Sequence, residues 1–146
     1  MKRLSMSIML VALVGACTSR TVVNQSQFQV APALAVERFL QAANTRDLVT
    51  MSRLFGGADG AWVDTRNREE VELRMNAIAE ILRHDDYEIT SEGTVPGTVL
   101  PNRRIGVDIS FPGGLRVGDV GFTVVLESTN RWLINAIELT KITEGA

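Results

Sequence analysis

The feature that most constrains the fold is a strict alternation of apolar and polar residues in the second half of the chain. From residue 105 to residue 111 every second residue is apolar: Ile105, Val107, Ile109 and Phe111. Successive side chains of a strand point to opposite faces, so this pattern predicts a β-strand with one buried face. Such a strand is typical of an antiparallel sheet that covers a core on one side.

Three further strands are predicted around this one, over residues 87–92, 115–127 and 131–142. A Pro-Gly-Gly turn at 112–114 and a Thr-Asn turn at 129–130 connect the last three as hairpins. In the strands 115–127 and 131–142 the apolar residues change from one face to the other. We expect a bulge in each, near residues 118–121 in the earlier one, and therefore a strongly curved sheet.

The first half of the chain has the helical period instead. Three stripes with this spacing are Val36, Phe39, Leu40 and Ala43; Leu48, Met51, Leu54 and Phe55; and Val71, Met75, Ile78, Ala79 and Leu82. Pro32 suits the first turn of the first helix, and Asn67 with Glu70 has the spacing of a capping box before the third. Residues 61–64 are predicted to form a short strand. Helices followed by an antiparallel meander predict an α+β fold.

The first sixteen residues have the pattern of a secretory signal. Lys2 and Arg3 precede an apolar run over residues 8–16, which ends in small residues beside Cys17. The run is far shorter than the ~20 residues that a membrane-spanning helix needs. We expect residues 1–16 to be a signal peptide, residues 17–30 to be a polar tether, and residues 31–146 to be a single α+β domain.

The sequence Leu-Val-Gly-Ala-Cys at 13–17 resembles the signal of bacterial lipoproteins. The resemblance implies cleavage between Ala16 and Cys17, and a thioether-linked diacylglyceride and an acyl chain such as palmitate on Cys17. Thr18 stands where this family has Asp in proteins kept at the inner membrane, which implies the outer membrane, facing the periplasm. The alternative is a plain cleavable signal followed by an incidental Cys, which would leave a free thiol in an oxidising compartment.

Composition excludes several classes of function. The 15 basic and 17 acidic residues leave a net charge of −2, which disfavours nucleic-acid binding. With one Cys and one His, neither a disulfide framework nor a metal site is predicted. The chain has no Gly-x-Ser-x-Gly motif and no phosphate-binding glycine loop, so no cofactor is expected.

The order of a helical hairpin, a short strand, a third helix and a curved sheet over residues 33–140 resembles the nuclear transport factor 2-like superfamily. The segments that carry the resemblance are residues 36–44, 47–55, 61–64 and 132–139, none of which is a strict signature. The resemblance implies a cone-shaped, cystatin-like roll with a pocket between the helices and the sheet. A cystatin-like or other helix-and-sheet sandwich is the alternative. Because members use the pocket for catalysis or only for binding, the fold does not decide the function.

Two carboxylates are candidates for a general base in such a pocket. Asp64 would share a strand face with Trp62, and Asp119 lies at the expected bulge, where a side chain can be directed into a cavity. The alternatives are that Asp64 caps a turn and that Asp119 is a solvated turn residue. The candidates for lining the pocket are Trp62, Tyr87, Phe122 and Trp132.

The sequence therefore favours a lipid-anchored, non-catalytic domain of the cell envelope that binds a small apolar ligand or a protein partner. One alternative is a pocket enzyme, similar to SnoaL-like cyclases or ketosteroid isomerases, with Asp64 or Asp119 as its base. Another is a module that dimerises through the outer face of its sheet.

Overall fold

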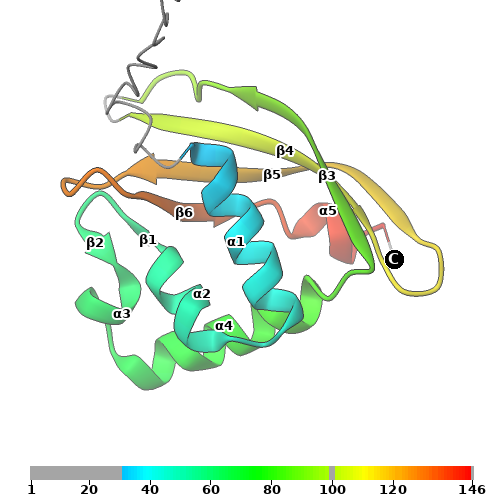
Figure 1. The fold of residues 1–146 in the computed structure, drawn as a ribbon, viewed down its shortest axis with the longest axis horizontal. Coiled ribbons are helices and arrows are strands. Elements are labelled where there is room, and N and C mark those ends of the chain that lie inside the picture. The colour runs from blue at the N-terminus through cyan, green and yellow to red at the C-terminus, as the bar shows by residue number, and fades with distance from the viewer. Residues whose placement is uncertain (1–30, 99–100, 146) are drawn as a thin grey trace, which may run out of the picture.

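The computed structural model describes residues 31–98 and 101–145. In chain order the elements are α1 (Pro32–Asn44), α2 (Leu48–Leu54), β1 (Gly56–Gly57), β2 (Gly60–Ala61), α3 (Trp62–Thr65), α4 (Arg68–Ile81), β3 (Asp86–Gly93), β4 (Asn102–Ser110), β5 (Arg116–Leu126), β6 (Trp132–Ile137) and α5 (Thr140–Thr143). Strands β3, β4, β5 and β6 form one antiparallel sheet in that order. The helices α1, α2 and α4 lie to one side of it (Figure 1). The predicted α+β class is confirmed.

Side-chain caps define where two of the helices begin. The Asp47 carboxylate accepts a hydrogen bond from the backbone N–H of Thr50 at 3.0 Å, and this cap starts α2. The Asn67 side chain accepts from the backbone N–H groups of Glu69 and Glu70, as predicted for the start of α4. These bonds satisfy N–H groups that have no partner within the helix. The carboxylate of Glu70 pairs with Arg74 one turn later.

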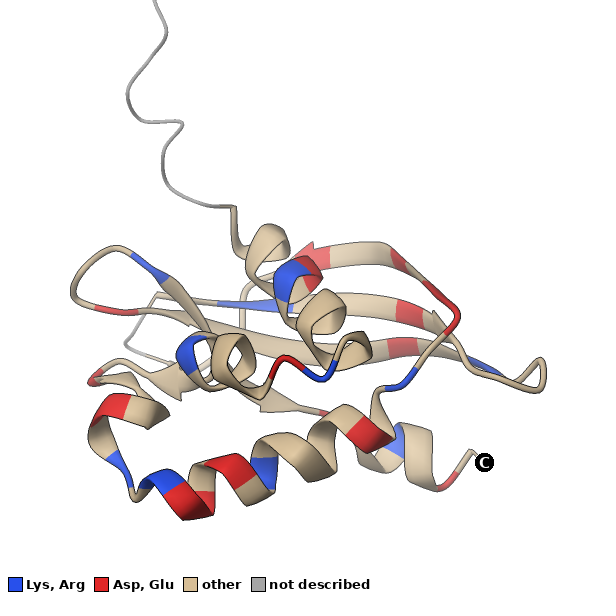
Figure 2. Cartoon of the chain, turned by 60° about the horizontal axis from the view of Figure 1, so that its bottom comes forward, with Lys and Arg blue, Asp and Glu red and all other residues tan. Residues whose placement is uncertain are grey.

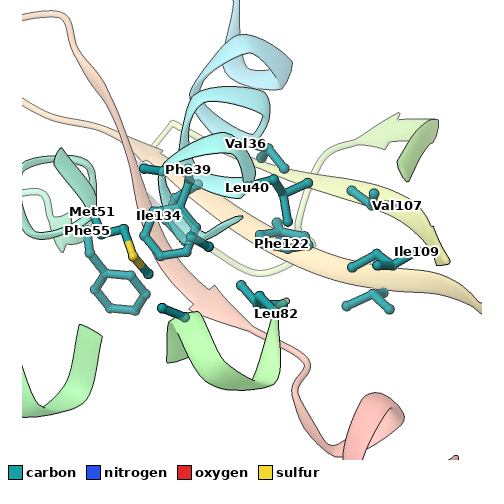
Figure 3. Close-up of a cluster of buried hydrophobic side chains, with 14 of the residues drawn as sticks. Val36, Phe39, Leu40, Met51, Phe55, Leu82, Val107, Ile109, Phe122 and Ile134 are labelled. Atoms are coloured by element: carbon teal, nitrogen blue, oxygen red, sulfur yellow. The ribbon is translucent and has the colours of Figure 1, made fainter. Parts of the chain in front are cut away.

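The core lies between the helices and the sheet. The apolar stripe of α1 and the inward residues of β4 and β5 have no exposed surface, including Val36, Phe39, Leu40, Ile105, Val107, Ile109, Val120, Phe122 and Val124. Figure 3 shows Phe122 between Leu40 of α1 and Leu82, the residue that follows α4. The alternation of apolar and polar residues predicted for β4 is therefore confirmed, because the apolar face of this strand packs against the helices in the core.

The bulge predicted near residues 118–121 is confirmed. Val107 of β4 pairs with Val120 of β5, but Ile109 pairs with Val117, so Gly118 and Asp119 both lie opposite one residue of β4. Asp119 takes a positive φ of 49° there. The extra residue turns the rest of β5 over, so that its apolar residues reach the core on both sides of the bulge.

The other two strand pairs of this sheet also contain register shifts. Thr123 of β5 pairs with Ala136 and Val124 pairs with Ile134, which leaves Asn135 of β6 as an extra residue and confirms the predicted slip. A third shift lies in β3 between residues 89 and 91. The sequence did not predict it, because the outward residues of β3 are all polar and show no change of face.

The predicted strand over residues 61–64 is wrong beyond its first residue. Only Gly60–Ala61 pairs with Gly56–Gly57, and Trp62–Thr65 form the short helix α3. The Trp62 N–H donates to Phe55 O at 2.8 Å, and its ring packs against Phe55 with the ring centroids 4.6 Å apart. This tertiary contact turns the chain toward α4.

The last strand is shorter than the predicted range of 131–142. β6 ends at Ile137, the N–H of Leu139 donates back to the carbonyl of Ile137, and the chain turns into α5. This turn brings Ile142 back against the core, where it is buried. The apolar residues after Ile137 therefore have helical rather than strand geometry.

The predicted signal peptide, the tether, Ala16 and Cys17 lie outside the described residues. Within residues 31–98 and 101–145, the helices lack the combination of length and apolar character that crossing a membrane requires.

Candidate functional site

Two adjacent grooves lie on the surface of the helical layer, along the contact between α2 and α4. The cationic groove, with a volume of about 330 Å³, is lined by Arg53 and Arg68 together with Leu48, Val49, Ser52, Val63, Val71 and Glu72. The acidic groove, of about 390 Å³, is lined by Glu69 and Glu72 together with Leu48, Leu73 and Asn76. The two grooves share Leu48 and Glu72 and therefore lie side by side.

Each groove carries an exposed apolar side chain. Val49 in the cationic groove is 56% exposed and Leu73 in the acidic groove is 66% exposed, and they are the large hydrophobic residues that stand out on the described surface. Leu73 points outward because the opposite side of α4 carries the buried residues Val71, Met75 and Ala79. Exposed apolar groups that gather beside a groove are typical of an interaction surface.

A third groove lies between α1 and α2. It has a volume of about 550 Å³, and Arg38, Thr45, Arg53 and Leu54 are among its lining residues. Arg53 therefore separates this groove from the cationic groove. All three of these grooves belong to the helices, whereas the space between helices and sheet is filled by the buried side chains of Figure 3.

The four residues predicted to line a pocket belong to the core or pack against it. Phe122 has no exposed surface and lies in the core. Trp62 packs on Phe55 and under the guanidinium of Arg66, whose Cζ is 4.2 Å from the ring centroid. Tyr87 meets the edge of the His84 ring, and Trp132 is half-buried at the start of β6. None of the four lines the three grooves.

Asp64 lies on the surface in the short helix α3 and lines none of the three grooves. We expected Asp64 and Trp62 to share one face of a strand. This prediction is wrong, because residues 62–65 are helical. The side chain of Asp64 is solvent-exposed.

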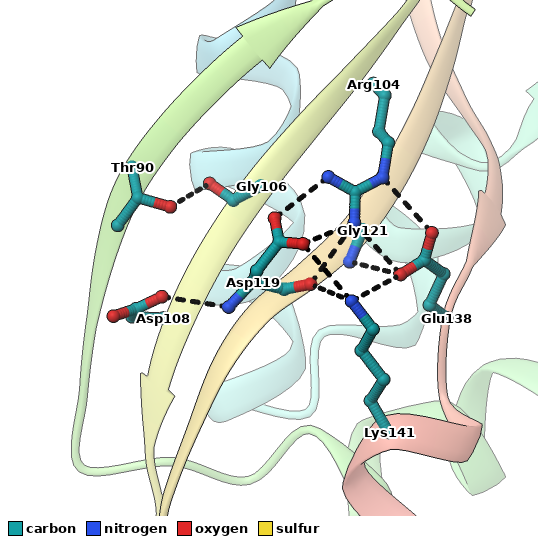
Figure 4. A network of polar contacts seen from close by, with 8 residues as sticks. All are labelled: Thr90, Arg104, Gly106, Asp108, Asp119, Gly121, Glu138 and Lys141. Carbon is teal, nitrogen blue, oxygen red and sulfur yellow. Dashed lines mark hydrogen bonds and ion pairs between the residues drawn. The ribbon is translucent and has the colours of Figure 1, made fainter.

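Asp119 lies in a cluster of four charged residues on the face of the sheet opposite the helices (Figure 4). This ion quartet consists of Arg104 on β4, Asp119 on β5, and Glu138 and Lys141 after β6. The guanidinium of Arg104 donates to Asp119 Oδ1 at 2.9 Å and to Glu138 Oε2 at 3.0 Å. Lys141 Nζ lies 3.2 Å from Asp119 Oδ2 and 3.1 Å from Glu138 Oε2. Each carboxylate therefore contacts both cations.

Two glycines make room for this quartet. Gly106 and Gly121 pair directly across β4 and β5. A Cβ on Gly106 would lie 2.5 Å from Asp119 Oδ1, and one on Gly121 would lie 2.5 Å from Glu138 Oε1. The sequence analysis did not single out Arg104, Glu138 and Lys141. The sequence signal for these three residues is the pair Gly106 and Gly121. Each glycine stands at an outward position of its strand, between apolar residues.

The quartet lowers the pKa of both of its carboxyl groups. Hydrogen bonds from Arg104 and Lys141 hold the pKa of Asp119 at about 2, and the same two cations hold that of Glu138 at about 2. A carboxylate with so low a pKa is a poor proton acceptor near neutral pH. Its oxygens are also occupied by donors, so the geometry gives no support to Asp119 as a general base.

We expect acid to weaken the domain partly through this quartet. The pKa values of both groups fall from ordinary values of 3.8 and 4.5 to about 2 in the folded chain. Their stabilisation is therefore complete above about pH 5 and is lost as the pH falls toward 2. In urea unfolding, the double variant Asp119→Asn with Glu138→Gln should lose less stability than the parent chain between about pH 6 and pH 3.

The exposed Glu144→Gln variant is the matched control, and it should keep the parent's dependence on pH. An equal loss of stability in the double variant and in the parent would contradict a stabilising role for the quartet.

The buried His84 has a structural role. Its Nδ1 lies 2.7 Å from Leu82 O, and the Asn44 side chain bonds to both the N–H and the carbonyl of His84. These contacts join the end of α1 to the segment after α4. Within the part of the chain that the structure describes, no group of three or more His, Cys, Asp or Glu side chains could hold a metal ion.

Comparisons with protein-family models, with curated proteins and with solved structures found no match to this chain.

Proposed function

We propose that this chain is a non-catalytic lipoprotein of the cell envelope, anchored through Cys17 at the outer membrane, whose domain binds a protein partner through the α2–α4 face. The anchor is supported by the lipoprotein-like sequence at 13–17. The observation that carries the binding function is the pairing of exposed Val49 and Leu73 with two adjacent surface grooves.

The filled core favours a protein partner over a small apolar ligand. Phe39, Leu40 and Phe122 have no exposed surface and occupy the space where a pocket of the cone type would open. A ligand there would have to displace well-packed side chains. The grooves on the helices lie at the surface, where the side chains of another protein can reach them.

The same proposal includes a strongly curved sheet and a cone-shaped domain. The three register shifts in the sheet support strong curvature, since each bulge increases the local twist of a strand. A curved sheet with helices on one face is what a cone-shaped, cystatin-like roll of the nuclear transport factor 2-like type requires. No observation favours the enzymatic alternative, because Asp64 is exposed and Asp119 is neutralised by two cations.

Site-specific photocrosslinking in intact cells tests the binding face. A benzophenone amino acid replaces Val49 or Leu73 in the full chain, and the matched control carries it at Ser128, which is exposed on the β5–β6 turn. We expect discrete protein adducts from positions 49 and 73 and none from position 128. The absence of adducts at 49 and 73, or the same adducts at all three positions, would contradict the proposal.

A further inference from the structure

We infer that the partner bound by the α2–α4 face is a second copy of this chain. This inference rests on the proposed function and names the partner of the same surface. The two grooves are neighbours that share Leu48 and Glu72, yet they differ in charge. The cationic groove has two arginines and one carboxylate in its lining, whereas the acidic groove has two carboxylates and no cation.

The charges of these grooves are not neutralised within the chain. Among the described residues, no carboxylate lies within ion-pair distance of Arg53 or Arg68, and no cation lies within that distance of Glu69 or Glu72. Figure 2 shows basic and acidic residues following one another along α4. Opposite charges on a partner would therefore find unoccupied counterparts here.

The outer face of the sheet is different. Its charges are already paired, in the ion quartet and in the contacts of Arg116 with Glu88 and Asp108 at 3.4 and 3.1 Å. A partner that bound this face would have to break these ion pairs, or it would gain little binding energy from charges that are already paired. Among the surfaces described, the sheet face that the sequence analysis considered for dimerisation is thus the less suitable one.

Two copies of the α2–α4 face complement each other. A two-fold interface brings the same patch of both copies together, so that one part of the patch faces another part of its copy. With the axis near Leu48 and Glu72, which line both grooves, Arg53 and Arg68 of each copy face Glu69 of the other. In this arrangement we expect Val49 of one copy to lie by Leu73 of its partner, which would bury both exposed apolar side chains.

Disulfide trapping between two differently tagged full-length chains tests the geometry. One chain carries Val49→Cys and the other carries Leu73→Cys, and both keep Cys17. We expect a disulfide-linked species that contains both tags when the cells are oxidised. The control pairs Val49→Cys with Ser128→Cys and should give no such species.

Charge reversal tests whether the partner is the same chain. The variant Arg53→Glu with Arg68→Glu makes both grooves acidic, and the variant Glu69→Arg with Glu72→Arg makes both basic. Each variant alone repels its own copy, so trapping within it should fall by about tenfold. When the two variants are expressed together, every contact pairs opposite charges and trapping should return. A merely structural effect of the substitutions would not be rescued in this way.

Two further outcomes separate this inference from the proposed function. If no species with both tags forms, while photocrosslinking at 49 and 73 still captures a different protein, the second copy is excluded and the binding face stands. If positions 49 and 73 give neither a disulfide nor a photoadduct, both the inference and the proposed function are wrong.

Discussion

Replacing Phe122 by Ala is expected to lower the free energy of unfolding by about 4 kcal/mol. The ring has no exposed surface and lies between Leu40 of α1 and Leu82, the residue that follows α4 (Figure 3). The substitution removes the buried ring and leaves a cavity at the centre of the packing between sheet and helices, which can collapse only partially. A domain of this size has roughly 5 to 15 kcal/mol of stability, so most of it could be lost.

Urea unfolding followed by the fluorescence of Trp62 and Trp132 measures this change. Phe122→Leu keeps much of the volume and should cost clearly less, so a graded response remains visible even if the Ala variant is largely unfolded. The exposed Ser128→Ala serves as the control, with an expected change within about 0.5 kcal/mol. A loss below about 1 kcal/mol for Phe122→Ala would mean that the residue does not organise the core.

The second large effect is expected at Cys17. Cys17→Ala removes the only thiol of the chain and with it the attachment of lipid that the sequence at 13–17 predicts. Each buried methylene of an acyl chain contributes about 0.8 kcal/mol, so two or more chains hold a protein firmly on a membrane. The variant should therefore leave the membrane fraction almost completely, with its domain still folded.

Fractionation of cells with a carbonate wash measures this release. Thr18→Ala is the matched control, since it changes the neighbouring residue and keeps Cys17, and it should stay in the membrane pellet. A Cys17→Ala chain that remained in the washed pellet would exclude the anchor. It would leave the α2–α4 face unaffected, because that face does not depend on how the chain reaches the envelope.

The two bulges show how far periodicity alone can predict this fold. In β5 the apolar residues change face between Val117 and Val120, and the structure has its register shift at that place. The prediction succeeded because side chains alternate along a strand, so a continuous buried face requires an extra residue wherever the pattern slips. The register shift in β3 was not predicted, because the outer face of this strand is polar throughout and shows no change in its apolar pattern.

The wrong predictions come from contacts between different elements of the fold. The residues after Ala61 and after Ile137 have compositions that suit a strand, and the sequence analysis extended both strands too far. Packing of Trp62 on Phe55 turns the first segment into α3, and burial of Ile142 against the core turns the second into α5. Neither contact partner lies in the same element, so no local pattern contains the information.

The candidate site differed most from expectation. Phe122, which was expected to line an interior pocket, is buried in the core. The α2–α4 grooves are lined by residues of separate helices, such as Arg53 with Arg68 and Leu48 with Leu73. In the sequence, Val49 and Leu73 are ordinary apolar residues of helical segments. Both fall outside the predicted apolar stripes of their helices, but only the tertiary structure places them beside two neighbouring grooves.

The sequence by itself determined the α+β class, the three longer helices with the cap at Asn67, most of the strands and two of the bulges, because these depend on the period of buried residues and on hydrogen bonds within a few residues. Only the tertiary structure decided that the interior is filled, that Asp119 is held in an ion quartet, and that two grooves of opposite charge lie side by side. These features arise from side chains far apart in the chain, whose distances are set by how the helices pack on the sheet.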